Sequence, residues 1–311
     1  MILSDNIRGA SFMAGAMAAF VLNDTMMKLV FAELELFQAI FLRGLLLSLL
    51  LALLGLPRGQ LLHRPTRSDA GALALRVTGE IGSSVCFLTA LYHMPLANAT
   101  AIIQVIPLAL TLAAALLFGE QVGWRRYSAI AVGFAGVMVI VRPGAEGFDA
   151  YALWAVAAVG FMVLRDLATR RFSTAIPSLY IAFVTAVLTA AVAGLVALIR
   201  DWQPMTASGL GLLAISACFL VFGYLFSIKA MRVGEVAFVS PFRYTILIWA
   251  IVLGIVVFGD IPDGWTLLGA TIVVATGIYT FYRERKLFRA VAQTAVQTAE
   301  GVSPGPRSAR R

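Results

Sequence analysis

Ten long apolar segments, separated by short polar stretches, make up most of this chain. A helix needs about twenty mostly apolar residues to cross roughly 30 Å of hydrocarbon. Runs of that length predict ten membrane-spanning helices, at residues 9–31, 36–56, 70–92, 96–118, 125–142, 150–169, 178–199, 209–228, 235–258 and 264–282. The loops between them are short, and no soluble domain fits. The predicted fold class is therefore an all-α integral membrane protein.

The composition agrees with this pattern. Hydrophobic residues make up 60% of the 311 residues and charged residues 13%, against about 45–50% and about 25% in a soluble domain. The net charge of +8 could indicate nucleic-acid binding. The basic residues, however, lie in short loops between apolar runs rather than on one soluble face, so we expect a lipid bilayer and no nucleic acid as partner.

Loop charges predict the orientation. If the N-terminus is cytoplasmic, Lys and Arg favour the inner loops about seven to one, which is a strong positive-inside signal. We expect a multi-pass protein of the bacterial inner (cell) membrane with both termini in the cytoplasm. The segment Ala14-Gly15-Ala16 resembles a signal-peptide cleavage site, but the apolar run continues past it, so the first span is kept. Residues 287–311 are expected to form a disordered cytoplasmic tail.

The two halves of the chain repeat each other, as residues 9–142 (spans one to five) and 150–283 (spans six to ten). The matches include Trp124 with Trp265, Gly136 with Gly277, Arg142 with Arg283, Asp24 with Asp166, Lys28 with Arg170, Phe87 with Tyr224, and Gly119 with Gly259. Five spans are an odd number of crossings, so the second copy must enter the membrane from the opposite side. Inverted repeats are typical of secondary transporters, whose binding site lies between the copies.

The chain also resembles the drug/metabolite transporter superfamily, in its ten-span EamA-type branch. The resemblance rests on the paired halves, on Asn23-Asp24 with Lys28, on Met94-Pro95-Leu96-Ala97 followed by Pro107, on Gly119-Glu120, and on the segment from Ser240 to Thr245. It implies the ten-span fold and transport of amino acids, nucleotide-related compounds, vitamins or drugs. In bacteria such transport is most often outward. These motifs mark architecture and do not identify the substrate.

Charged residues inside the spans cost at least about 2.5–3.5 kcal/mol each, so every one needs a partner or a wet cavity. Helical spacing predicts three pairs that share a face, and they are Asp24 with Lys28, Arg76 with Glu80, and Asp166 with Arg170. The pairs either neutralise one another or act in gating and coupling, together with Arg165. Related pairs on opposite sides of the membrane could form and break as a carrier alternates.

Arg43 and Arg243 have no partner in their own helix. Away from their terminal residues, the expected spans hold five bases (Lys28, Arg43, Arg76, Arg165 and Arg243) against three acids (Asp24, Glu80 and Asp166). A substrate carboxylate or phosphate could supply the missing charge. Backbone carbonyls and water at unwound helix ends are the alternative. Pro241 favours the substrate interpretation for Arg243, because proline bends a helix and bent helices are common at midplane sites.

Glu80 is the candidate for proton coupling, because a carboxyl in apolar surroundings can exchange protons with a gradient. Arg76, one turn away, favours its charged form, and the two effects oppose each other. We expect the polar and aromatic residues at similar depth to help bind substrate, namely Asn98, Gln104, Tyr244 and Trp249.

Together these features predict a secondary active transporter working by alternating access, which exports amino acids or other small carboxylate-bearing metabolites. The alternatives are an uptake carrier for a larger solute, such as a vitamin or nucleoside-like compound, and a lipid-handling flippase or intramembrane enzyme. The chain lacks Walker A, HExxH, GxSxG and CxxC sequences and has only two histidines, so we expect no enzyme activity, cofactor or metal. Small residues in the fifth and tenth spans could pack the halves together or form a dimer face, which leaves monomer and homodimer open.

Overall fold

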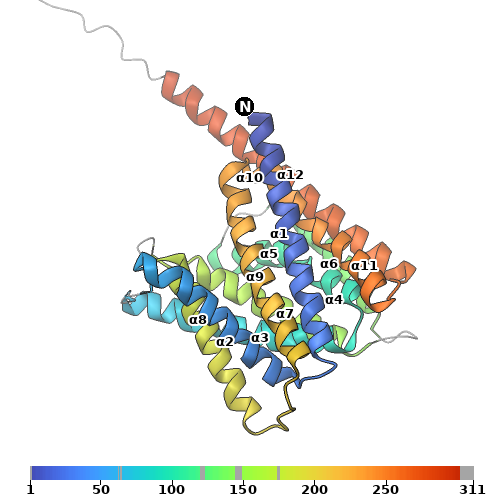
Figure 1. Ribbon diagram of the computed structural model, residues 1–311. Coiled ribbons are helices and arrows are strands. Elements are labelled where there is room, and N and C mark those ends of the chain that lie inside the picture. The colour runs from blue at the N-terminus through green and yellow to red at the C-terminus, as the bar shows by residue number, and fades with distance from the viewer. Residues whose placement is uncertain are drawn as a thin grey trace, which may run out of the picture.

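Ten membrane-spanning segments form one helical bundle in the computed structural model (Figure 1). The structure describes the chain except residues 1, 62, 64, 120–122, 144–148, 174–175 and 302–311, and except the side chains of residues 2–4, 236–237 and 284–301. Eight spans are continuous: α1 (Ile2–Val30), α2 (Leu36–Gly55), α3 (Arg67–His93), α6 (Trp124–Val141), α7 (Ala152–Thr169), α8 (Ser178–Ala197), α9 (Ala207–Val233) and α12 (Gly264–Gly301). A short turn η1 (Leu56–Arg58) follows α2. The all-α fold and the ten predicted spans are confirmed.

The fourth and ninth spans are broken. The fourth consists of α4 (Leu96–Ile103) and α5 (Ile106–Phe118), and the ninth of α10 (Val236–Val239), η2 (Ser240–Tyr244), α11 (Thr245–Leu253) and η3 (Gly254–Phe258). Pro107 and Pro241 sit at the start of α5 and η2, where a missing N–H does least harm. The bend predicted at Pro241 is confirmed, whereas the break in the fourth span was not predicted. Because α4 contacts α11, the two broken spans meet inside the bundle.

Both broken spans end on a glycine with left-handed backbone. Gly119 closes α5 with φ +67°, and Gly259 closes η3 with φ +71°. Only glycine adopts this conformation without steric cost. The glycines are therefore matched in backbone geometry as well as in sequence. Glu120, the next residue of the first pair, lies outside the described residues.

The helices pair between the halves of the chain. The most extensive contacts join α1 to α9, α3 to α7, α2 to α8, and α6 to α12. When each span is replaced by its counterpart in the other half of the chain, five spans away, the same four pairs result. The α1–α9 and α3–α7 pairs are converted into each other, and the α2–α8 and α6–α12 pairs are each converted into themselves. The first turns of α1 and the far end of α12 lie at the same end of the molecule (Figure 1).

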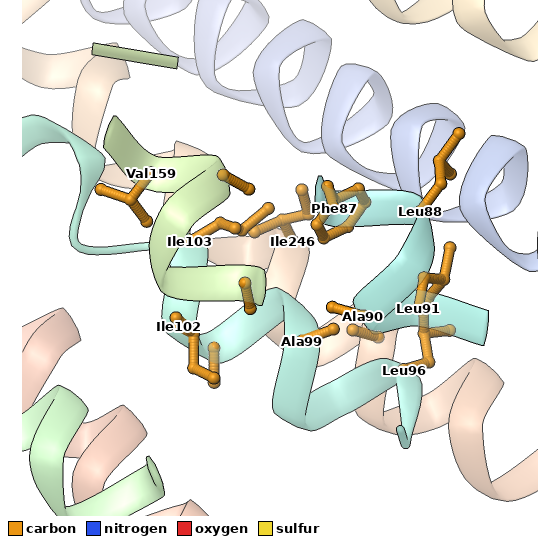
Figure 2. Packing of buried hydrophobic residues seen from close by; sticks show 14 of the residues in the cluster. Phe87, Leu88, Ala90, Leu91, Leu96, Ala99, Ile102, Ile103, Val159 and Ile246 are labelled. Atoms are coloured by element: carbon orange, nitrogen blue, oxygen red, sulfur yellow. The ribbon is translucent and has the colours of Figure 1, made fainter. Parts of the chain in front are cut away.

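The hydrophobic core gathers where α3, α4, α7 and α11 converge. Figure 2 shows Phe87, Leu91, Ile102 and Ile246 packed there, each at most 8% exposed. In lipid the outside of a bundle is as apolar as its core, so close van der Waals packing rather than hydrophobic burial holds the helices together. Small residues make that packing possible.

Glycines bring two of the crossing pairs into backbone contact. A Cβ added to Gly79 on α3 would lie 2.7 Å from the backbone nitrogen of Arg165 on α7. One added to Gly269 on α12 would lie 2.5 Å from the carbonyl oxygen of Gly136 on α6. The small residues of the fifth and tenth spans therefore pack the two halves of one chain together.

The C-terminal helix is longer than expected. α12 continues to Gly301, whereas the disordered tail was expected from residue 287. This corrects the boundary of the tail, because the segment that follows the membrane is rich in Ala, Gln and Arg, which have good helix propensity. Residues 302–311, the rest of the expected tail, lie outside the described residues.

We predict that Gly79→Ala lowers the free energy of unfolding by about 1–3 kcal/mol, because its methyl group meets backbone that cannot move aside. Gly160→Ala is the matched control, since nothing lies within 4 Å of a Cβ at that helical position. Thermal unfolding of both variants in the same detergent measures the difference. Equal effects at the two positions would contradict the close crossing of α3 and α7.

Candidate functional site

Five charged side chains from four spans line up through the middle of the bundle. They are Asp24 on α1, Arg43 on α2, Glu80 on α3, and Arg165 and Asp166 on α7, and we call them the charge ladder. Arg165 binds Glu80 at 3.4 Å through Nη1 and Asp166 at 2.9 Å through Nε. Arg43 interacts electrostatically with both Asp24 and Glu80. The signs alternate along the ladder, so each charge has an opposite neighbour in a region where an isolated charge is costly.

The Asp24 end of the ladder is built on α1 and α9. The Asn23 amide donates a hydrogen bond to Asp24 Oδ1 at 2.9 Å. The Asn23 carbonyl oxygen in turn accepts one from the Ser216 hydroxyl at 2.8 Å. Asn23 is buried, so these bonds fix its amide and, through it, the Asp24 carboxylate.

Tyr224 on α9 completes the site, and the sequence did not indicate it as a functional residue. Its hydroxyl interacts electrostatically with Glu80 and Arg165, and its ring packs edge-on against Phe20 at 5.5 Å. The side chain is nevertheless 45% exposed. Tyr224 therefore joins the ladder to the surface of α9. The repeat matched Tyr224 with Phe87, and this polar replacement at a core position was the signal that could have found it.

Glu80 has a different partner from the one its helix spacing predicts. We expected Arg76, one turn away, but Glu80 pairs with Arg165 across the α3–α7 crossing. Arg76 Nη1 instead donates to the Thr169 hydroxyl at 2.5 Å. The glycine contact at Gly79 brings α7 near enough for the cross-helix pair to form. Likewise, Asp166 binds Arg165, while the predicted partner Arg170 lies exposed at the end of α7.

Lys28 also has a different partner. It was expected to pair with Asp24, but its ammonium donates to the Met94 carbonyl oxygen at 2.6 Å and lies 3.8 Å from Asp260 Oδ2. It also sits 5.2 Å from the centre of the Phe258 ring. Lys28 thus ties α1 to the turn between α3 and α4 and to the end of the ninth span. We call these contacts the outer clasp.

The other predicted substrate-binding residues lie apart from the ladder. Gln104 marks the break between α4 and α5, and the Asn98 side-chain oxygen is buried without a hydrogen-bond partner among the described residues. Arg243 is exposed on η2. Tyr244 is buried, with its hydroxyl wedged against Gly277 on α12. Trp249 is partly exposed on α11.

A bundle of ten spans with two interrupted helices and a line of charges at its centre is the architecture of a membrane transport protein. The chain belongs to the EamA-like transporter family, whose model matches residues 7–142 and 150–282. The two matched segments are the two halves recognised from the sequence, and the resemblance to this family is confirmed.

Curated relatives of the chain are transporters with different cargoes. An S-adenosylmethionine uptake transporter of Rickettsia prowazekii is 29% identical over 62% of this chain, which spans 65% of that protein. A riboflavin transporter of Vibrio cholerae is 29% identical over 67% of this chain and 70% of its own length. A pseudopaline exporter of Pseudomonas aeruginosa is 27% identical over 83% and 90%, respectively. The relatives therefore agree on membrane transport and differ in substrate and direction.

A solved crystal structure shares the fold. It superposes with a TM-score of 0.61 at 20% sequence identity, over 89% of this chain and 98% of the other. The similarity extends over almost the whole length of that protein, so the ten-span bundle is a shared architecture.

We predict that Glu80 couples energetically to Arg165 rather than to Arg76. In a double-mutant cycle, Glu80→Gln with Arg165→Gln should give a coupling energy of about 1–3 kcal/mol, because each single variant breaks the ion pair between these two residues. The matched cycle of Glu80→Gln with Arg76→Gln should give less than about 0.5 kcal/mol. Thermal unfolding measures both cycles, and a larger value for Arg76 would contradict the cross-helix pair.

Proposed function

We propose that this chain is a secondary active carrier that works by alternating access between two halves inserted in opposite orientations. The exchange of helix pairs, the two broken spans and the two matched glycine ends support this arrangement. The positive-inside bias of the loop charges supports an orientation with both termini in the cytoplasm. Of the residues in the ladder, Asp24, Arg43 and Glu80 come from the first half, and Arg165 and Asp166 from the second.

The observation that carries the proposal is the charge ladder, which joins residues of four spans from both halves of the chain. A structural bundle has no need of charged residues on four spans, since each costs energy in hydrocarbon. Carriers use such groups to bind polar solutes near the midplane. Movement of the halves relative to each other would change the distances between ladder residues, and so couple binding to conformation.

The outer clasp gives the carrier a means of closing to the outside. Lys28 would keep the outer end of the bundle closed, because it joins α1 and Met94 in the first half to Asp260 in the second half. The repeat matches Lys28 with Arg170, which would lie on the inner side, so a related clasp there would close the carrier to the cytoplasm. Asp260 matches Glu120, which lies outside the described residues.

A second contact supports the outer closure. Arg142 Nη2 binds Asp263 Oδ2 at 2.5 Å in the outer loops. Burial raises the pKa of Asp263, but hydrogen bonds from Thr266 and the Arg142 charge outweigh it, and the net pKa lies below its ordinary value. Because a depressed pKa favours the folded pair above the unfolded pKa, this contact holds at neutral pH and weakens as the pH falls through the folded pKa.

For the substrate we propose small carboxylate-bearing metabolites, with amino acids first, moved outward. The guanidinium groups of Arg43 and Arg243 can each bind a carboxylate with two hydrogen bonds. Uptake of a larger solute is the second candidate, and the uptake transporters for S-adenosylmethionine and riboflavin among the relatives favour it. Proton coupling through Glu80, which pairs with Arg165 across the α3–α7 crossing, remains part of the proposal.

The test is transport by the purified chain in proteoliposomes. Labelled amino acids, S-adenosylmethionine and riboflavin are offered separately, with and without an imposed pH gradient. We expect at least one solute to be moved faster than into empty liposomes. For direction, cells with and without the gene are compared, and lower internal pools of the substrate indicate export. A chain that moves no member of the panel would refute the proposal.

We predict that Lys28→Ala lowers transport at least about tenfold, because it removes all the contacts of the outer clasp. Lys229→Ala is the matched control, since Lys229 is an exposed lysine that lies over the Phe12 ring and is not part of the outer clasp. The double variant Lys28→Asp with Asp260→Lys restores the opposite charges and should recover part of the activity. Unchanged transport in Lys28→Ala would count against the clasp.

A further inference from the structure

An apolar groove runs along the surface of the bundle where α5, α6 and α7 meet, and none of its lining residues belongs to the charge ladder. We call it the α5–α7 groove. Its volume is about 320 Å³ and every residue that lines it is apolar, a size found among ligand pockets of about 300–1,000 Å³. The groove is open to the surroundings, since Leu116 and Met138 in its wall are 72% and 45% exposed. Within a bilayer, such a surface takes up hydrocarbon.

The shape of the groove suits a single chain rather than a helix. It follows the fourth span from Val105 to Leu116, which is about 16 Å at the helical rise. Spread over that length, its volume gives a cross-section of roughly 20 Å². This admits one extended hydrocarbon chain, whereas a second helix is about 10–12 Å across. Gly160 keeps the α7 wall open, because a Cβ there would meet nothing within 4 Å among the described residues.

One end of the groove lies beside arginines. Arg171 follows α7, and its guanidinium carbon lies 5.8 Å from the centre of the Phe118 ring, the last residue of α5. Leu116 in the groove wall is two residues before Phe118. The chain returns from this end into α6, whose second residue is Arg125. In all, residues 119–126 and 169–173 contain four arginines and one acid, Glu120, so this end of the groove is positively charged.

Aromatic residues place these arginines at the level of the lipid head groups. Trp124 begins α6 and is 73% exposed, and Tyr127, one turn further, is 43% exposed. Exposed Trp and Tyr collect at the boundary between hydrocarbon and head groups. The guanidinium carbon of Arg125 lies 5.3 Å from the centre of the Trp124 ring, at this boundary. The groove itself extends from there into the hydrocarbon layer.

We propose that the α5–α7 groove binds one acyl chain of an anionic phospholipid, whose phosphate is held by Arg171 and Arg125. A phospholipid carries its anion above its apolar chains, in the same order as the arginines and the groove. Guanidinium binds phosphate with two parallel hydrogen bonds, and basic pockets between spans suit anionic head groups. The positive charge of the four arginines disfavours the choline cation of a zwitterionic lipid. This inference concerns lipid binding and does not depend on the proposed transport activity.

The experiment measures lipid binding to the purified chain by native mass spectrometry. The chain in detergent is titrated with phosphatidylglycerol and, separately, with phosphatidylcholine that has the same acyl chains. We expect the anionic lipid to bind at least about tenfold more tightly, which corresponds to about 1.4 kcal/mol. Glycerol 3-phosphate, which has the phosphate but no acyl chains, should not displace it.

Two kinds of variant test the two parts of the site. The double variant Arg125→Gln with Arg171→Gln should lose most of the preference for the anionic lipid, and Arg58→Gln is its control, an exposed arginine after α2. Gly160→Leu fills the groove and should weaken binding of phosphatidylglycerol at least about tenfold. Gly71→Leu is its matched control, because Gly71 is also an exposed helical glycine with nothing within 4 Å of a Cβ.

A photoactivatable phosphatidylglycerol, with the reactive group in its acyl chain, tests the wild-type chain directly and needs no variant to fold. Cross-links should concentrate in residues 102–116 and 156–163. Cross-links concentrated on other spans would overturn the inference. So would equal binding of the two lipids, displacement by glycerol 3-phosphate, or unchanged binding in Gly160→Leu. A dimer that Gly160→Leu dissociates would also overturn it, since the groove would then hold a second copy of the chain.

Discussion

The fold and the candidate site both depend on one constraint, which is that a charge within the hydrocarbon layer must have a partner. An unpaired charge costs at least about 2.5–3.5 kcal/mol there, so the charge ladder forms only if α1, α2, α3 and α7 bring their charged residues together. The crossing of α3 and α7 at Gly79 does this for Glu80 and Arg165. The packing of these helices therefore also assembles the site. Packing that separated the helices would leave charges without partners.

The same constraint explains where the spans can be interrupted. Unpaired backbone groups are tolerated within a membrane only where protein or a wet cavity covers them, and the breaks in the fourth and ninth spans lie inside the bundle, where α4 meets α11. Matched breaks, matched glycine ends and helix pairs that exchange with one another all point to two halves of the same construction. Under the proposed alternating access, two such halves would exchange their conformations.

The sequence predicted the spans well and the partners within the site poorly, for a physical reason. A spanning helix is a local property of about twenty residues, and Pro241 signals its own bend locally. The partners of Glu80 and Lys28 are set by other helices, and helix spacing within one span therefore pointed to the wrong residues. Tyr224 was missed because its importance comes from which charges surround it. The break after Gln104 was missed, although Pro107, in the interior of the expected fourth span, is a local signal for it.

The most direct test of the account is whether the charge ladder can be reached by water from both sides of the membrane. A cysteine at position 224, in a chain with Cys86 and Cys218 replaced by serine, is treated with a membrane-impermeant thiol reagent in right-side-out and in inside-out vesicles. The account predicts modification from both faces, well above that of a cysteine at Leu195, which is 67% exposed on the outside of the bundle. Modification from neither face, or from one face only whatever solute is present, would contradict it.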